Sequence, residues 1–256
     1  MLKPESVTPS GGPGWKGARF RLTGPDAFHI AKVLRYREGQ AVELFDGHGG
    51  RFSGKLSRVA PEEIEGVILE SLAAPRVAGV TLHLYPGLLK AAAWEWTLEK
   101  GTELGAASFT PVVTPRTVVL LERERIEAKR ERWAKIALAA AKQCRRSDVP
   151  EIRPPLRFPE AIREATERGL TLVAWEGMAG ASARESIPPA LARAAAGGQA
   201  VVASVFVGPE GGFSDEEVEL AEALGAVCFG LGPSTLRAET AALAALCAIL
   251  YELGHL

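Results

Sequence analysis

Two loops near the C-terminus constrain this chain most strongly, because each follows an apolar run of strand length. The run at 201–207 leads into residues 208–212 (Gly-Pro-Glu-Gly-Gly), and the run at 227–230 leads into residues 231–236 (Leu-Gly-Pro-Ser-Thr-Leu). A helical pattern follows each loop, so the segment predicts two strand–loop–helix units. Open α/β sheets bind ligands at the carboxyl ends of their strands, so we expect the functional site here.

The remaining residues follow two patterns. After an irregular stretch at 1–18, short strands at 19–22, 41–45, 51–59 and 66–72 and a helix at 25–34 favour a small β-barrel. From residue 80 onward strands alternate with helices, which favours an α/β domain with a mostly parallel sheet. A proline-containing linker at 73–76 separates the two patterns. We therefore expect domains at 1–73 and 74–256.

The second domain has strong and weak signals for its elements. We expect strands at 80–85, 108–113, 170–175, 201–207 and 227–230, and helices at 91–104, 125–143, 159–168 and 238–253. Ser214 and Glu217 predict a capping box that begins another helix. The segment 182–199 is weakly patterned, with at most a short helix after Pro188 and Pro189. The last helix is apolar on nearly every side, so we expect it to be buried, within one chain or between two.

The charges are distributed unevenly along the chain. Residues 1–58 hold ten Lys and Arg against five Asp and Glu, and residues 113–153 hold eleven against six. Two basic regions suit a polyanion such as nucleic acid, although charge blocks are often merely solvated faces. Residues 206–256 hold Arg237 as their one basic residue against eight acids. An acidic region suits a small cationic ligand or solubility.

Other motifs exclude several classes of protein. The loop at 208–212 lacks the G-x-G-x-x-G spacing of a dinucleotide site and the Lys of a P-loop. Cys144, Cys228 and Cys247 show no paired spacing, so we expect free thiols and no metal site. No apolar run is long enough to span a membrane, and no signal-peptide pattern begins the chain. We expect a cytoplasmic protein without a membrane segment.

The two C-terminal loops, with Leu-Arg-Ala-Glu-Thr-Ala at 236–241, resemble the SPOUT superfamily of RNA methyltransferases. Within it the chain is most similar to the RsmE family, which methylates N3 of a uridine in 16S ribosomal RNA of the small subunit. The narrower match is supported by three further stretches, namely 29–35 with Gly39, then 100–105, and then 142–146 with 149–152. Asp46-Gly47 also fits it. Arg145 departs from the pattern, because a small residue such as Gly is expected there.

This resemblance implies a fold, a cofactor and partners. The fold would be an N-terminal PUA-like RNA-binding β-barrel followed by a SPOUT α/β domain whose chain forms a trefoil knot. The cofactor would be S-adenosylmethionine, the substrate 16S rRNA or the small ribosomal subunit, and the assembly a homodimer. A SPOUT ribose 2′-O-methyltransferase and a non-catalytic ribosome-assembly factor remain alternatives.

Roles for individual residues follow from the resemblance and from the chemistry. We expect the cofactor to be held mainly by backbone groups of Val207, Gly208, Pro209, Gly211, Leu231, Gly232, Ser234 and Leu236. Arg237 is the candidate to anchor uracil or phosphate and to stabilise the developing anion, or it pairs with Glu239. Glu210 would bind a ligand in the pocket, shape the pocket or cap the helix that follows the loop. The candidates for RNA contact are Arg19, Lys32, Arg35, Arg37, Arg145 and Arg146. Trp94, Trp96 and Trp133 are expected in the core.

Overall fold

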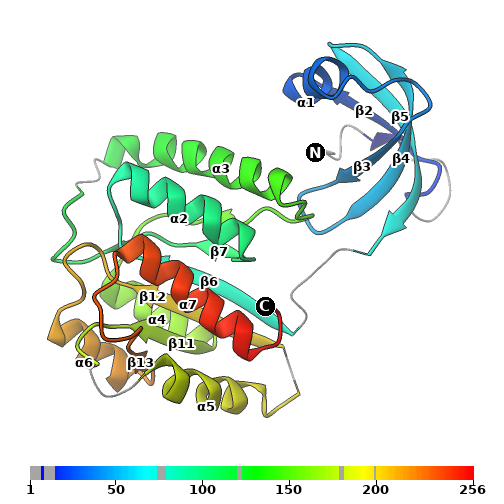
Figure 1. The fold of residues 1–256 in the computed structure, drawn as a ribbon. Helices are drawn as coiled ribbons and strands as arrows, with labels where there is room; N and C mark the ends of the chain where they lie inside the picture. Colours follow the sequence, from blue (N-terminus) through cyan, green and yellow to red (C-terminus); the bar gives the residue numbers. More distant parts are fainter. Residues whose placement is uncertain (1–6, 9–14, 74–78, 120–122, 179–181, 199) are drawn as a thin grey trace. The chain divides into compact units, whose positions relative to one another are not determined.

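A computed structural model describes residues 7–8, 15–73, 79–119, 123–178, 182–198 and 200–256. The chain forms two compact units, of which unit 1 comprises Met1–Arg76 and Ala141–Val149, and unit 2 comprises Val77–Ala140 and Pro150–Leu256 (Figure 1). Most of the predicted linker falls on 74–78, outside the described residues. Domains at 1–73 and 74–256 stay a prediction. No helix in the described ranges is long and apolar enough to cross a membrane.

Unit 1 contains a five-stranded antiparallel sheet with the order β1-β2-β5-β4-β3. Its strands are β1 (Val7–Thr8), β2 (Arg19–Thr23), β3 (Ala41–Phe45), β4 (Arg51–Val59) and β5 (Glu63–Leu72). Alternate side chains of β2, β4 and β5 are buried, as the apolar alternation predicts. The ring of Phe20 lies over Gly54 and Gly66, where a Cβ would come within 2.9 and 2.4 Å of it. Part of the stretch expected to be irregular is strand β1.

A helical segment and a distant loop complete unit 1. Helix α1 (Pro25–Phe28) begins with a proline and continues into a π-helix, η2 (His29–Val33), so the predicted helix is confirmed with a wider last turn. Residues 141–149 join this unit through an ion pair of 2.5 Å between Lys142 and Asp26. The N–H of Gly49 also donates to the carbonyl of Ser147 at 3.0 Å.

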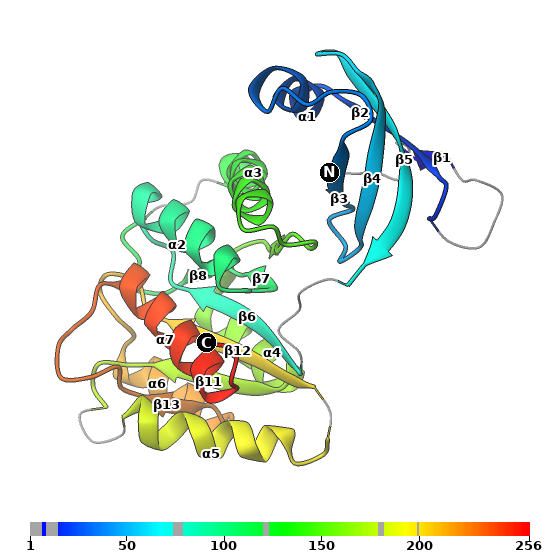
Figure 2. The same ribbon diagram turned by 45° about the vertical axis from the view of Figure 1, so that its right-hand side comes forward.

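Unit 2 is an α/β layer structure around a six-stranded, entirely parallel sheet with the order β13-β11-β12-β6-β7-β9. Helices α2, α5 and α7 cover one face, and α4 and α6 cover the other (Figure 2). The main strands are β6 (Val80–Pro86), β7 (Ser108–Phe109), β9 (Glu151–Ile152), β11 (Leu170–Ala174), β12 (Val201–Val207) and β13 (Val227–Phe229). The helices are α2 (Ala91–Glu103), α3 (Ile126–Gln143), α4 (Phe158–Arg168), α5 (Ala183–Ala195), α6 (Asp215–Ala223) and α7 (Ala238–Glu252), and a 3₁₀ turn, η3 (Arg123–Arg125), precedes α3.

Two predictions for unit 2 were wrong. The strand expected at 108–113 is two short strands, β7 and β8 (Val112–Val113), and β8 pairs with β10 (Leu156–Arg157) rather than with the main sheet. Pro111 has no N–H to continue the ladder, which explains the break. Helix α5 contains Pro188 and Pro189 instead of following them. It begins at Ser182, whose N–H donates to Glu185 at 3.3 Å, and it buries Ile187 and Leu191.

The core beneath α4 and α6 brings the strand ends together. Tyr85 of β6 stacks on Phe206 of β12 with ring centroids 4.5 Å apart, and Phe158 packs edge-on against Phe206. Phe213, just after the first glycine loop, packs on Phe158 at 5.0 Å. Each such buried ring contributes about 2–3 kcal/mol. The core therefore fixes the carboxyl ends of β6 and β12 and the loop that follows.

Candidate active site

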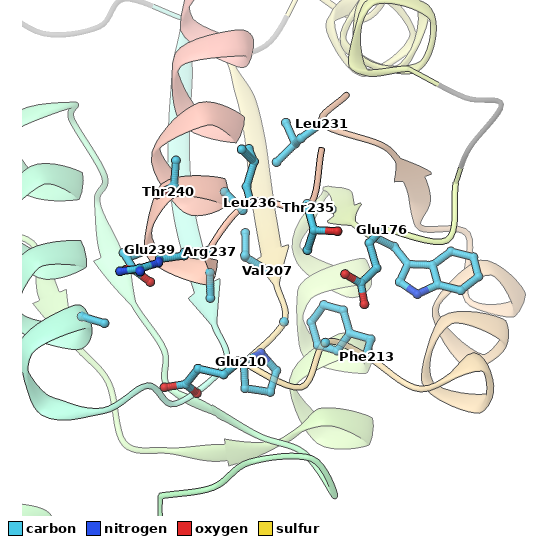
Figure 3. A pocket seen from close by; sticks show the side chains of 18 of the residues that line it. Glu176, Val207, Glu210, Phe213, Leu231, Thr235, Leu236, Arg237, Glu239 and Thr240 are labelled. Atoms are coloured by element: carbon cyan, nitrogen blue, oxygen red, sulfur yellow. The ribbon is translucent and has the colours of Figure 1, made fainter. Parts of the chain in front are cut away.

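A cavity of about 900 Å³ lies at the carboxyl ends of β11 and β12 (Figure 3). Its walls come from both predicted loops, from the residues after β11, and from the first turns of α2 and α7. Its volume falls within the usual range for small-molecule sites. The two C-terminal loops thus contribute to one site, as their positions after neighbouring strands predict.

The strand order explains why a crevice forms at this place. The chain leaves β6 toward β7 on one side, whereas β12 lies on the other side of β6. Ligand sites are expected beside such a reversal, and the cavity lies next to it, over the ends of β11 and β12. The N–H of Gly87 donates to the carbonyl of Val207 at 2.7 Å, and a Cβ on Gly87 would lie 2.3 Å from the nitrogen of Pro209. Glycine is therefore needed where the loop after β6 passes the first glycine loop.

The first loop, residues 208–212, is a tight turn held from outside the cavity. Gly212 has a φ of +69°, which favours glycine, and its N–H donates to the carbonyl of Pro209 at 2.9 Å. Arg116 donates to the carbonyls of Gly211 and Phe213 at 3.2 and 3.0 Å. This arginine clamps the loop from the side of the segment after β8. The loop then enters α6 through the predicted Ser214–Glu217 capping box, which the structure confirms.

The second loop, residues 231–236, leaves its backbone available. Within the described part of the chain, no hydrogen bond joins its N–H groups to another backbone group. Gly232 has a φ of +114°, another conformation that favours glycine. Free backbone donors and acceptors along a cavity wall can read the edge of a heterocycle such as adenine without charged side chains.

Charged side chains line the cavity on different sides. Glu210 accepts a hydrogen bond of 3.2 Å from the N–H of Lys90, the residue that caps the N-terminus of α2. Arg237 caps α7 by position, and its side chain has no hydrogen-bond or ion-pair partner in the described ranges, Glu239 included. Glu176, which follows β11, points into the cavity between Thr235 and Phe213 (Figure 3).

The structure brings most of the predicted site residues together. Those that line the cavity are Val207, Gly208, Pro209, Glu210, Leu231, Gly232, Ser234, Leu236 and Arg237. Gly211 is the exception, because its carbonyl accepts from Arg116 and it does not line the cavity. Which of these residues bind a ligand stays a prediction.

Several residues that line the cavity were missed in the sequence. Trp175 ends the strand predicted at 170–175 and Glu176 follows it, and a parallel neighbour of β12 must end beside β12, so their position was the available signal. Trp96, expected in the core, is 42% exposed and lines the cavity, whereas Trp94 and Trp133 are buried as expected. No local pattern marks Arg116.

A separate polar cluster lies under the other half of the sheet and contributes nothing to the cavity lining. Glu164 accepts from Arg153 at 2.9 Å, from Arg168 at 2.8 Å and from the hydroxyl of Tyr85 at 3.2 Å. The bond from Arg153 is the main reason that the pKa of Glu164 is lowered. Burial, with Arg168 and Arg153 nearby, lowers the pKa of His83 to about 4, and its Nδ1 lies 2.7 Å from the hydroxyl of Ser108.

The predicted RNA-contact residues all belong to unit 1. Arg19 on β2, Lys32 in η2, and Arg35 and Arg37 just after it are exposed. Three apolar side chains of the same segment are also exposed, namely Phe28 (55%), Val33 (58%) and Leu34 (46%).

The loop after α3 carries the other two candidates. Arg145 is exposed, whereas Arg146 is half-buried and donates to Asp148 at 2.7 Å. Arg145 has a φ of +61°, a conformation that favours glycine. A glycine at this position, expected from the sequence pattern, would fit the observed backbone.

Comparisons with known proteins agree across the whole chain. A family described as "RNA methyltransferase domain" matches residues 77–250, and one described as "RNA methyltransferase PUA domain" matches residues 22–69. Ribosomal RNA small subunit methyltransferase E of Bacillus subtilis is 34% identical over 91% of this chain and 90% of its own length.

Two solved structures resemble this chain closely. A methyltransferase of Legionella pneumophila, solved with bound S-adenosylmethionine, has a TM-score of 0.79 and 30% identity over 94% of each chain. Ribosomal RNA small subunit methyltransferase E of Neisseria gonorrhoeae, bound to S-adenosylmethionine, has a TM-score of 0.80 and 25% identity, and the match covers 98% of this chain and 97% of that one.

Proposed function

Because the chain belongs to the ribosomal RNA small subunit methyltransferase E family, we propose that it methylates N3 of one uridine in 16S rRNA of the small ribosomal subunit. It is a methyltransferase, and its cofactor is S-adenosylmethionine, whose sulfonium supplies the methyl group when bound. The observation that carries the proposal is the cavity formed by the two loops, with Arg237 in its lining.

The residues of the cavity fit this cofactor. The backbone of 231–236 offers unpaired polar groups to the adenine, and the first loop offers bare backbone at Gly208 and Gly212. A Cβ on Gly212 would lie 3.0 Å from Oε1 of Glu176, so a side chain there would narrow the space between the loops. We assign cofactor contact to Val207, Gly208, Pro209, Leu231, Gly232, Ser234 and Leu236. Gly211 contributes indirectly, by holding the turn through Arg116.

The reaction requires that uridine N3 lose its proton and meet the methyl group in line with sulfur. The guanidinium of Arg237 would stabilise the negative charge that develops on the uracil ring, because it has no other partner in the described part of the chain. Glu210 would shape the cavity rather than move a proton, since it already accepts the N–H of Lys90.

We assign RNA binding to unit 1. Lys32, Arg35 and Arg37 lie beside the exposed Phe28 and Leu34, and this mixture of cations and apolar side chains suits unstacked single-stranded RNA. Arg19, Arg145 and Arg146 would add phosphate contacts. We propose an RNA-binding domain at 1–73 and a methyltransferase domain at 74–256, whose chain would form a trefoil knot, with residues 141–149 packing with the first unit. The enzyme would act in the cytoplasm, where its ribosomal substrate is made.

Mass spectrometry of the product tests the reaction directly. Small ribosomal subunits that lack the modification are incubated with the protein and labelled S-adenosylmethionine. The RNA is then digested, and its nucleosides are identified by mass spectrometry. We expect 3-methyluridine at one position. A methyl group on a ribose or on another base would contradict the N3 assignment.

The variant Arg237→Ala tests the role of the arginine. We expect the rate of methyl transfer to fall by about 100-fold or more, the range for loss of one transition-state donor, with cofactor affinity little changed. Arg193→Ala, at an exposed position on α5 outside the cavity, is the matched control. A wild-type rate in Arg237→Ala would remove this residue from the catalytic machinery.

A further inference from the structure

The charges that line the cavity are segregated between two walls. Arg237, Glu239 and Glu210 lie on one side, and Glu176 lies on the other, beside Thr235 and Phe213 (Figure 3). The backbone of Lys90 belongs to the wall of Glu210, because its N–H donates to that carboxylate. The guanidinium of Arg237 is on the wall away from Glu176.

Two of the three carboxylates that line the cavity lie at the N-termini of helices, whose positive ends offset their negative charge. Glu210 accepts the N–H at the cap of α2, and Glu239 lies in the first turn of α7, beside the positive end of that helix. Glu176 has no hydrogen bond or ion pair within the described part of the chain. Its side chain is exposed in the cavity, so a ligand that fills the cavity would take it out of contact with solvent.

A carboxylate that loses its water needs a compensating positive charge. S-adenosylmethionine brings a sulfonium cation, whereas the product S-adenosylhomocysteine has lost it with the methyl group. We propose that Glu176 makes the cavity selective for the cationic cofactor over the neutral product, and so favours product release after each transfer. This proposal rests on the cofactor assignment above, and it assigns to Glu176 the discrimination between the cofactor and its product.

Binding calorimetry of both molecules to three variants tests the proposal. Glu176→Gln removes the charge at nearly constant shape, and Glu176→Asp keeps it. In Glu176→Gln we expect the affinity for S-adenosylmethionine to fall about tenfold and that for S-adenosylhomocysteine less than about threefold. Glu176→Asp should keep most of the preference. Glu219→Gln, an exposed acid of α6 outside the cavity, should bind both molecules like the wild type.

Salt provides an independent readout that needs no turnover. The wild-type preference should shrink at high ionic strength, and the preference of Glu176→Gln should not. Equal losses of both affinities in Glu176→Gln, or no loss, would overturn the role of Glu176 while leaving the cofactor assignment intact. If wild-type protein bound neither molecule, the cofactor assignment itself would fail. Thermal melting of each variant shows that it is folded.

Discussion

At the scale of single residues, backbone strain marks two of the arginines proposed to contact RNA. Arg35 and Arg145 are the two non-glycine residues with positive φ in the described ranges, at 54° and 61°. A non-glycine residue in this conformation costs about 1–2 kcal/mol. Both lie in exposed turns of unit 1, where glycine would remove the strain. Strained residues persist where function requires the side chain, which agrees with a contact to phosphate.

Replacing Arg145 by glycine separates stability from binding. Arg145→Gly should raise the free energy of unfolding by about 0.5–1 kcal/mol, because the relief of strain exceeds the added entropy of the unfolded chain. The same variant should bind RNA more weakly. Arg145→Lys keeps strain and charge and should match the wild type in both measurements. Chemical denaturation and RNA titration check this, and a less stable Arg145→Gly would contradict the strain.

His83 predicts a pH dependence of stability. Its folded pKa of about 4 lies below the ordinary 6.5, so the unfolded chain binds more protons between these values. Stability from the neutral ring is complete above pH 6.5 and is lost as the pH falls toward 4. The loss should be about 1–2 kcal/mol, because solvent screens this half-buried ring.

The variant His83→Asn checks this dependence, since its amide does not titrate and can form a hydrogen bond with the hydroxyl of Ser108 in either direction. Denaturation curves should show wild type losing stability relative to His83→Asn over that pH window. Parallel curves for the two proteins would show that the ring does not titrate there.

Sequence reasoning found the site residues that lie in a recognisable local sequence pattern. Val207 ends one apolar run, Leu231 directly follows the other, and both adjoin glycines, so the strand ends and the loops were visible in the sequence. Glu176 follows a strand too and precedes Gly177, but only the strand order reveals that it faces the same cavity. Arg116 reaches Gly211 across 95 residues of sequence, a contact that no local pattern can reveal.

At the scale of elements, the sequence reveals most helices and strands with their ends. The strands at 41–45, 51–59 and 201–207 match the structure at both bounds, because the first two show a strand-like alternation of side chains and the third is an apolar run. The full length of helix α5 was not predicted, because Pro188 and Pro189 lie inside it. Burial of Ile187 and Leu191 against the sheet and α7 outweighs the lost hydrogen bonds there.

The clamp on the first glycine loop gives a prediction at this scale. Arg116→Ala removes both hydrogen bonds to the loop and should weaken S-adenosylmethionine binding about tenfold, because the loop must then be ordered by the ligand. Arg163→Ala, on α4 outside the cavity, is the control and should bind normally. Calorimetry measures the affinities. Wild-type affinity in Arg116→Ala would show that the loop holds its shape without the clamp.

At the scale of the whole molecule, helix α7 suits the homodimer that the family resemblance predicts. Its inner side, including Ala245, Leu246 and Ile249, is buried within the chain. Its outer side carries the half-buried Leu243 and Cys247, followed by Tyr251, which is 69% exposed. Small and apolar side chains at intervals of about one turn form a face that a second copy could cover.

A charge on that outer face tests the dimer. Tyr251→Arg should shift the protein toward monomers in analytical ultracentrifugation, because a cation would be buried in the interface. Leu224→Arg, at an exposed apolar position after α6, should leave the association unchanged. If Tyr251→Arg sedimented like the wild type at every concentration, α7 would not be at the interface.

The segment 141–149, which packs with unit 1 although its neighbours in sequence belong to unit 2, has a consequence for the covalent topology. The chain passes between the units three times, so no single cut yields two complete fragments. A fragment ending at residue 73 would lack Lys142, the partner of Asp26, and Ser147, the acceptor for Gly49. Unit 1 can therefore complete its fold only after residues 141–149 have been synthesised, which requires more than half of the chain. During synthesis on the ribosome, much of unit 2 is made before unit 1 is complete.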